Sequence, residues 1–489
     1  MTRGRAAPVF AVTLCALIAA CRGGSGSGGR AEPPPARVLV FGIDGATWEV
    51  VEPMMRAGDL PHLKRLYDRG IHGVLEARPH NPSPVAWTTI FTGRLPADHG
   101  VLDWETAIST NRKVAALWEI TSARGLATDV LNVPGSWPPD RVDGSMLAGF
   151  PISHSTVDAG TGVVVRENGL RAPDVAPVFT ANAAAIARSA APLKAGAWSD
   201  WIELPVPGEP SERCMTRVRR LDAREIYLSP CYRIDGGVGV ASPAEALDRV
   251  RAVTGLRYVP EGPGWSRYAD PWTPEYLAEH FTQIARIQSG AAAVLASDPW
   301  RLFIFVDTLV DRVSHPYWAY ARPEDYDGVD PANARRHGEA VRDAYREVDR
   351  ELGAVLAAAT GAYDVVVVSD HGFRSNPDRK TLTGHHHVDG IYLISSARMR
   401  AQPGQRAHQE DVTPTLLYLL GLPVGRDMTG RVLPEVTAQL ARPIASVASL
   451  EGPARRGSAS PVDEKTWEQL KALGYVGGAA PRGESGRRR

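Results

Sequence analysis

The sequence predicts an α/β fold in which a doubly wound, mostly parallel sheet carries a β-rich insertion. Three observations support this prediction. Residues 365–368 are four consecutive valines, a run typical of a strand that helices bury on both faces. Residues 38–41 form a second apolar run, which also leads into a carboxylate beside glycine. Helix and strand patterns alternate up to residue 150 and resume after residue 272, as expected for two halves of one α/β core.

Changes in composition set the expected domain boundaries. A chain of 489 residues is long enough for one large domain with an insertion, or for two to three domains. Proline, glycine and short alternating stretches mark the insertion, and small and polar residues mark the C-terminal extension with its disordered tail. We expect a signal at 1–21, a flexible linker at 22–36, a core at 37–150 and 272–436, an insertion at 151–271 and an extension at 437–489.

Within the core, hydrophobic periodicity and start and stop residues predict the individual elements. Gly70 and Gly93 are expected to end two of the helices. In the first half we expect strands at 37–41, 73–77, 128–132 and 145–150, and helices at 60–70, 84–92 and 114–125. In the second half we expect strands at 301–306, 365–368 and 390–395, and helices at 273–296, 338–359 and 411–420. A last amphipathic segment is expected after Ser460.

The charge balance argues against a polyanion-binding protein. Lys and Arg together number 55, as do Asp and Glu, so the formal net charge is zero. Hydrophobic residues make up 44% and charged residues 22%, an ordinary globular composition. We therefore expect no nucleic-acid polymer as a partner.

The N-terminus has the features of an export signal. Two arginines precede an apolar run at 9–20, which is too short to span a bilayer as a mature helix. The following Ile18-Ala19-Ala20-Cys21 resembles a bacterial lipoprotein signal, in which Cys21 is lipidated after cleavage. The alternative is an ordinary signal peptide or a loose N-terminal anchor. Either way we expect an exported protein, on the periplasm-facing side of the cell envelope, that contacts the membrane only through the anchor. The sequence does not indicate an oligomeric state.

Cys214 and Cys231 are the two cysteines left after the signal and the lipidation site. Between them, residues 215–230 read as a hairpin with a turn at 222–224, which places the cysteines opposite each other at its open end. In an oxidising compartment such a pair is expected to form a disulfide.

Ser83 is expected at the start of a helix. Serine followed by Pro84 is typical of an N-cap and a first helical residue. Backbone N–H groups and the helix dipole at that end favour an anion. The alternative is that Ser83 only caps the helix.

Four groups of metal-ligand residues lie at or just beyond expected strand ends: Asp44, Asp311 with His315, Asp370 with His371, and His385-His386-His387. A spacing of four puts Asp311 and His315 on one helical face. Carboxylates and imidazoles in these numbers suit two divalent ions, with zinc preferred over manganese or iron because thiolates are absent from the set. The alternative is that these side chains are only packed or exposed residues.

Two such ions could clamp the attacking and leaving oxygens of an in-line displacement. One of them could also lower the pKa of a serine hydroxyl and make it a nucleophile. Ser83 fits that role, and Thr88 and Thr89 are the fallback candidates within the same helix.

These motifs together resemble the type I phosphodiesterase/nucleotide pyrophosphatase branch of the alkaline phosphatase superfamily, and in particular its bacterial predicted phosphohydrolases or phosphomutases. The resemblance covers residues 37 to about 435, without the insertion. It rests on Gly42-Ile43-Asp44-Gly45, Ser83 to Thr88, Thr92-Gly93 with Pro96 and His99-Gly100, Asp311 to His315, Ser369 to Gly372, His386 to Gly390, and the helix from Asp411 to Leu416 with Gly421-Leu422-Pro423.

The resemblance implies a ligand set for each ion. One ion would be held by Asp44, Ser83, Asp370 and His371, and the other by Asp311, His315 and His386. His385 and His387 stay open as alternatives to His386.

Two departures from the family pattern matter. Better-studied eukaryotic members have threonine where this chain has Ser83, and an asparagine that holds a phosphate oxygen where it has Asp103-Trp104.

The expected function is therefore that of an exported two-metal phosphohydrolase acting on a small phosphate ester, most readily a phosphodiester. A phosphomonoesterase or phosphotransferase of the same superfamily is the alternative. A sulfatase-like hydrolase would need x-Pro-x-Arg after the nucleophile, which Ser83 lacks. A phosphoglycerate mutase would be expected in the cytoplasm. A lipid-anchored binding scaffold is the non-enzymatic alternative, and the ligand set argues against it.

Overall fold

The structure is a computed structural model that describes residues 36–78, 82–103, 106–149, 163–166, 169–170, 175–234, 239–259 and 274–451. The expected signal with Cys21, the linker up to residue 35 and the amphipathic segment after Ser460 lie outside these residues.

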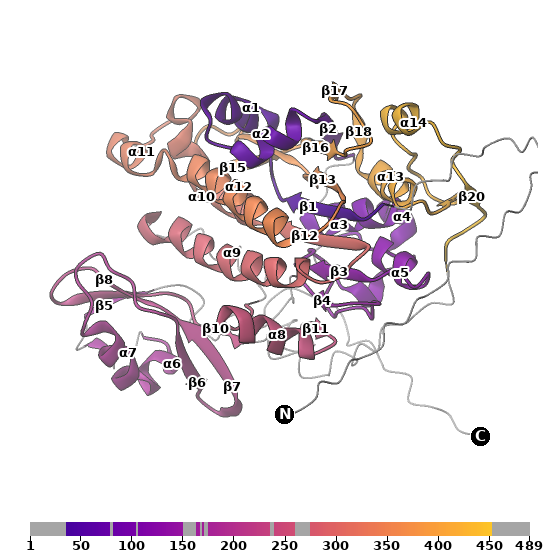
Figure 1. Cartoon of the computed structure of the whole chain (residues 1–489). Coiled ribbons are helices and arrows are strands. Elements are labelled where there is room, and N and C mark those ends of the chain that lie inside the picture. Colours follow the sequence, from indigo (N-terminus) through magenta and orange to yellow (C-terminus); the bar gives the residue numbers. More distant parts are fainter. Residues whose placement is uncertain are drawn as a thin grey trace, which may run out of the picture. The chain divides into compact units, whose positions relative to one another are not determined.

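A large mixed sheet forms the centre of the described chain (Figure 1). Its strands run in the order β11-β4-β3-β12-β1-β13-β16-β2-β17, and β18 also pairs with β2. The middle of the sheet, from β4 to β13, is parallel, whereas β16 is antiparallel to both neighbours. The strands are β1 (Val38–Ile43), β2 (Gly70–Glu76), β3 (Thr128–Leu131), β4 (Met146–Leu147), β11 (Ala241–Ser242), β12 (Leu302–Asp307), β13 (Asp364–Val368), β16 (Asp389–Ser395), β17 (Gln402–Pro403) and β18 (Ala407–His408).

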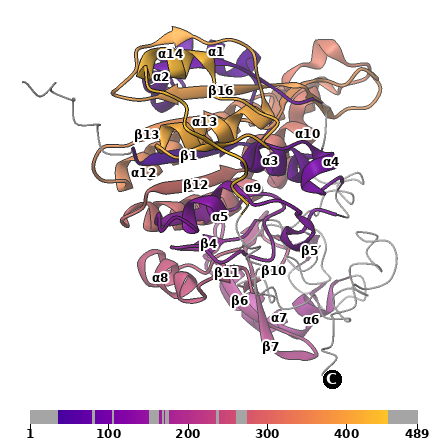
Figure 2. The same cartoon turned by 90° about the vertical axis from the view of Figure 1, so that its right-hand side faces the viewer.

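Helices cover both faces of this sheet, which confirms the predicted doubly wound α/β fold (Figures 1 and 2). One face packs against α1 (Trp48–Ala57), α2 (Pro61–Tyr67), α9 (Pro274–Ala296), α10 (Leu309–Ala321) and α12 (Ala340–Ala358). The other packs against α3 (Ser83–Thr92), α5 (Leu117–Ser122), α13 (Val412–Leu419) and α14 (Pro434–Leu440). Alternate residues of β1 serve the two cores, because successive side chains of a strand point to opposite faces.

Short elements complete the core. They are α4 (Pro96–His99), α8 (Glu245–Thr254), α11 (Pro331–His337), the β14 (Gly372–Ser375) and β15 (Gly384–His387) hairpin, and the β19 (Val424–Gly425) and β20 (Ser446–Val447) pair. None of the described helices is both long and apolar enough to cross a membrane.

The described residues between 163 and 234, within the expected insertion, contain two small antiparallel sheets and two α-helices with a hydrophobic cluster of their own. The third α-helix of the expected insertion, α8, packs into the main core. Its elements are β5 (Val163–Arg166), α6 (Pro177–Ala181), α7 (Ala183–Ala190), β6 (Ile202–Val206), β7 (Glu209–Thr216), β8 (Val218–Arg220), β9 (Glu225–Leu228) and β10 (Tyr232–Arg233). The strands β8 and β9 form the expected hairpin, and a disulfide joins Cys214 to Cys231. Further along the chain, β11 returns to the main sheet beside β4.

Gly70 does not end a helix as predicted, because α2 stops at Tyr67 and Gly70 begins β2. A side chain at Gly70 would place its Cβ 2.6 Å from the carbonyl oxygen of Ile394 on β16. The glycine is therefore required for close strand pairing rather than for a helix cap.

Candidate metal centre

Asp44 follows β1 at the carboxyl edge of the sheet, where open α/β folds bind their ligands. Its backbone N–H donates to the carbonyl of Asp307, 2.9 Å away at the end of β12, and its side chain is 1% exposed. The next residue, Gly45, has φ +77°, and a Cβ there would meet the Phe373 ring at 2.9 Å. Both the backbone conformation and the lack of space call for glycine after the carboxylate.

Ser83 is the first residue of α3, and Pro82 occupies the N-cap. The predicted N-cap was therefore wrong by one residue, although Ser83 does lie at the N-terminal end of a helix. The Ser83 hydroxyl lies 3.3 Å from Asp44 Oδ1 and 3.3 Å from His371 Nε2. The fallback hydroxyls are engaged elsewhere: those of Thr88 and Thr89 donate to carbonyls one turn earlier in the helix, at 2.7 and 3.1 Å.

Asp370 and His371 follow β13 and are fully buried. Hydrogen bonds from Gly45 N to Asp370 Oδ1 (3.4 Å) and from Gln409 Nε2 to the Asp370 carbonyl (2.5 Å) hold this turn. The Ser369 hydroxyl adds to them by accepting from Ala46 N and donating to the His371 carbonyl. The turn after β13 is thereby fixed against the turn after β1.

The Nε2 atom of His371 lies close to carboxylates from three different elements. It is 3.4 Å from Asp44 Oδ1, 3.6 Å from Asp370 Oδ2 and 3.8 Å from Asp311 Oδ1. Asp311 comes from α10, which follows β12, so the ends of three neighbouring parallel strands supply the three carboxylates.

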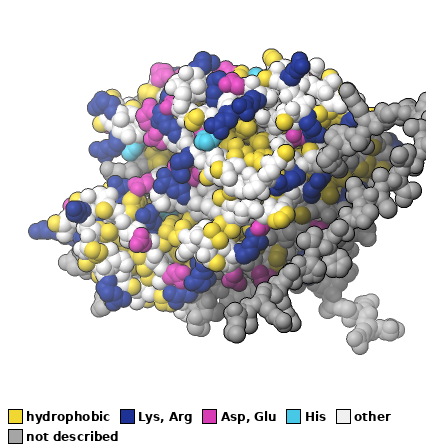
Figure 3. Space-filling view, in the orientation of Figure 1, with side chains coloured by type: hydrophobic (Ala, Val, Ile, Leu, Met, Phe, Trp, Pro, Cys, Tyr) yellow, Lys and Arg dark blue, Asp and Glu magenta, His cyan; other side chains and the backbone are white. Residues whose placement is uncertain are grey.

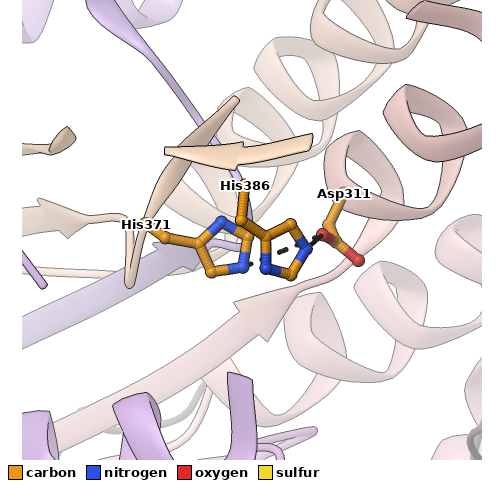
Figure 4. Close-up of side chains that lie close together, drawn as sticks. All are labelled: Asp311, His371 and His386. Carbon is orange, nitrogen blue, oxygen red and sulfur yellow. Dashed lines mark ion pairs between the residues drawn. The ribbon is translucent and has the colours of Figure 1, made fainter. Parts of the chain in front are cut away.

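A second cluster forms around Asp311 (Figure 4). His386 Nε2 is 3.1 Å and His315 Nε2 is 3.4 Å from Asp311 Oδ1, and the two imidazole nitrogens are 2.8 Å apart. The His386 ring also stacks on that of His371 with 3.7 Å between centroids. Of the three consecutive histidines, the structure brings His386 into this cluster.

Burial and neighbouring charges determine the direction in which the pKa of each of the three aspartates is shifted. Burial, together with the charge of Asp311, raises the pKa of Asp44 well above its usual range. Burial and the charges of Asp44 and Asp311 do the same to the pKa of Asp370. Burial also acts to raise the pKa of Asp311, but the His315 and His386 imidazoles outweigh it and hold that pKa well below the usual range. The site therefore concentrates negative charge that positive charge would relieve.

The residues present fit divalent cations. Asp311, His371 and His386 form one group, and Asp44, Asp370 and His371 form another, each with its ligand atoms within 4.8 Å of one another. Asp370 Oδ2 is buried without a hydrogen-bond partner among the described residues. Oxygen and imidazole donors without thiolates suit zinc, manganese or iron.

Sequence reasoning missed the residues that orient these side chains. Trp87 Nε1 donates to Asp44 Oδ2 at 3.0 Å, and Ser369 and Gln409 hold the turn after β13. The four-residue spacing between Ser83 and Trp87 was the available signal, because it puts both on one helical face. Asp103 lies in a turn where it accepts from the Thr106 amide and hydroxyl, each at 2.8 Å, and Trp104 lies outside the described residues.

Comparison with known proteins adds the family. The sequence profile of the type I phosphodiesterase / nucleotide pyrophosphatase family matches residues 38–415. Among curated proteins, a 2,3-bisphosphoglycerate-independent phosphoglycerate mutase of Bacteroides thetaiotaomicron is 29% identical over 138 residues, 26% of each chain. The chain thus spans about a quarter of the length of the curated relative it matches.

Similar solved structures include a phosphonate monoester hydrolase from Silicibacter pomeroyi, with 12% identity, a TM-score of 0.40, and coverage of 83% of this chain and 77% of that one. A 2-O GAG sulfatase has 12% identity and a TM-score of 0.41, with coverage of 84% and 75%. A phosphonoacetate hydrolase from Sinorhizobium meliloti 1021 has 13% identity and a TM-score of 0.34, with coverage of 70% and 57%.

The family match extends over most of the chain and includes every residue of the site described above. The chain belongs to the type I phosphodiesterase/nucleotide pyrophosphatase family.

Proposed function

We propose that this protein is a two-metal phosphodiesterase in which Ser83 is the nucleophile. The observation that carries the proposal is the position of the Ser83 hydroxyl at the start of α3, 3.3 Å from both Asp44 Oδ1 and His371 Nε2. A serine placed there lies near two candidate ligands of one ion. It also lies at the N-terminal end of a helix, where the helix dipole favours an anion.

In this proposal Asp44, Ser83, Asp370 and His371 hold one divalent ion, and Asp311, His315 and His386 hold the other. When bound, the ions supply Lewis acidity that lowers the pKa of the serine hydroxyl and offsets charge on the phosphoryl oxygens. Zinc is the first choice, and manganese or iron would also suit these donors.

The protein's own residues position the reaction. The Ser83 hydroxyl loses its proton to solvent and its oxygen attacks phosphorus. An Oγ–P bond forms as the bond to the leaving oxygen breaks, and the leaving group departs as an oxyanion that takes up a proton from water. Water then cleaves the Oγ–P bond and regenerates the hydroxyl. The positive end of the α3 dipole lies at Ser83 and adds electrostatic stabilisation of the anion.

Charge favours a diester. Three aspartates against two dications leave about one positive charge before Ser83 ionises, which suits a singly charged phosphodiester. One observation favours a phosphomonoesterase or phosphotransferase as the second candidate. Burial raises the pKa of Asp44, and the charge of the buried Arg312 guanidinium, next to Asp311, partly opposes that rise. An additional positive charge of this kind would help to bind a dianionic monoester.

The test compares Ser83→Ala with Thr88→Ala on bis(p-nitrophenyl) phosphate and p-nitrophenyl phosphate. Ser83→Ala should keep its metal content and fold while kcat falls by several orders of magnitude, because the covalent route is lost. Thr88→Ala should stay near wild-type activity. Near-normal diester turnover by Ser83→Ala would refute the nucleophile, whereas a wild-type preference for the monoester would refute only the substrate class.

We also propose that the protein is exported and anchored to the cell envelope through a lipid on Cys21. The support is the sequence pattern of residues 1–21. Cys21→Ala should move the protein from the membrane fraction to the soluble fraction. Unchanged membrane association of this variant would contradict the lipid anchor.

A further inference from the structure

Helix α3 contacts the metal centre through two residues, Ser83 and Trp87. They are four positions apart, so they lie on the same helical face one turn from each other. The Trp87 indole N–H donates to Asp44 Oδ2 at 3.0 Å, while the Ser83 hydroxyl lies 3.3 Å from Asp44 Oδ1. One helix thus engages both oxygens of a single carboxylate, and all three side chains are buried.

Gly42 makes room for the indole beneath Asp44. Gly42 is on β1, two residues before Asp44, and lies with Val38 and Val40 on the strand face that packs against Trp87. A Cβ at Gly42 would lie 2.6 Å from Cη2 of the Trp87 ring. The missing side chain therefore permits the hydrogen bond, and the ring also stacks near-parallel on Phe91 with 5.9 Å between centroids.

We propose that Trp87 is a positioning residue: its indole N–H holds Asp44 Oδ2 so that Oδ1 is turned toward Ser83 and His371, ready for a divalent cation. Trp87 also joins the helix that carries Ser83 to the turn after β1 that carries Asp44. This inference rests on the proposed function for its effect on turnover, but its effect on cation affinity does not depend on the role of Ser83.

The competing explanation is that the indole only fills the core. Trp87→Phe separates the two explanations, because phenylalanine keeps an aromatic ring but has no N–H. The chain offers a matched control in Trp118, a buried tryptophan that also packs near Phe91, at 5.6 Å, and also donates to a carboxylate, Asp140 Oδ2, at 2.9 Å. That carboxylate pairs with Arg112 and takes no part in the metal centre.

The experiment measures Zn²⁺ affinity by chelator competition, thermal stability of the metal-free protein, and turnover, for wild type, Trp87→Phe and Trp118→Phe. Both variants should lose similar stability without metal. Only Trp87→Phe should bind Zn²⁺ about 10- to 100-fold more weakly and lose turnover to a similar extent, as for other residues that orient a ligand.

Equal Zn²⁺ affinity of Trp87→Phe and Trp118→Phe would overturn the positioning role and leave the proposed function intact. Weakened affinity in Trp87→Phe combined with an active Ser83→Ala would support the positioning role and reject Ser83 as nucleophile. A wild-type protein that takes up no Zn²⁺, Mn²⁺ or Fe²⁺ would overturn both.

Discussion

Among single residues, His386 shows how local geometry selects a ligand. In β15, successive side chains alternate in direction, so His385 and His387 point away from the side on which His386 meets Asp311. His386 also approaches His315 and His371, whose rings come from α10 and from the turn after β13.

We therefore expect His386→Ala to bind about one divalent ion fewer per chain than wild type and to lose most of its turnover. His385→Ala, one residue earlier on the opposite side of the strand, should retain its metal content and activity. Elemental analysis of both variants after reconstitution checks this. A normal metal content in His386→Ala would show that another histidine is the ligand.

Asp129 on β3 predicts a pH-dependent stability away from the metal centre. Burial raises its pKa to about 7 from an ordinary value of 3.8, and its Oδ1 accepts from Ser145 N at 2.8 Å. Because the unfolded chain ionises this carboxyl near its ordinary value, folding stability should fall as pH rises from about 4 to about 7 and then level off.

Asp129→Asn keeps an acceptor oxygen but cannot ionise. Its stability should match that of wild type near pH 4 and exceed it at pH 8, by on the order of 1–3 kcal/mol. Thermal unfolding at both pH values measures this difference. If the variant were no more stable than wild type at pH 8, the claim that burial raises the pKa of Asp129 would be contradicted.

At the scale of elements, the C-terminal end of α3 is as constrained as its start. Gly93 has φ +67°, and a Cβ there would lie 3.1 Å from Cδ of Pro414 on α13. Gly125 has a nearly identical φ of +68° with nothing within 4 Å of the added atom. The two glycines differ in packing but not in backbone strain.

Gly125→Ala should cost about 1 kcal/mol, the strain of a left-handed alanine. Gly93→Ala should cost about 1 kcal/mol more because α13 must shift. The difference between the thermal unfolding midpoints of the two variants measures how much the α3–α13 contact adds to the stability loss. Equal losses would mean that α13 does not restrain the helix.

The insertion offers a separate prediction through its disulfide. Cys214 and Cys231 are 17 residues apart, and closing a loop of this length stabilises by about 3 kcal/mol or less. The Cys214→Ala/Cys231→Ala double variant should be cleaved faster by protease within the insertion while its core retains metal. Two free thiols in the oxidised wild-type protein would refute the disulfide.

The sequence predicted most core elements because they carry strong local signals. The valine run became β13, the helix after Ser83 became α3, and the run after residue 338 became α12. Local signals could not predict that β16 pairs antiparallel to β13, because strand direction depends on the path of the chain between them. The expected strand at 145–150 proved to be only the two-residue β4.

The site was predictable to the extent that ligand residues follow strands. Asp44, Asp311 and Asp370 could be grouped because neighbouring parallel strands end at one edge. Ser369 and Gln409 could not, because each acts through a tertiary hydrogen bond that no sequence spacing specifies. For Trp87, the spacing from Ser83 indicates the shared helical face but not the hydrogen bond to Asp44.

At the scale of the whole molecule, charge is balanced rather than concentrated. The face in Figure 3 intersperses Lys and Arg with acidic and polar side chains, in keeping with equal totals of 55 basic and 55 acidic residues. The like charges that bear on function are instead buried, in the group formed by Asp44, Asp311 and Asp370. Such a set is stable only if cations or protons neutralise it.

Metal content tests this account most directly. Purified protein is stripped with a chelator, reconstituted with Zn²⁺ or Mn²⁺, freed of excess metal, and analysed for bound metal per chain. We predict about two ions per chain, since the seven candidate ligand residues form two groups, one around Asp44 and one around Asp311. One ion or fewer with either metal would contradict the two-metal centre.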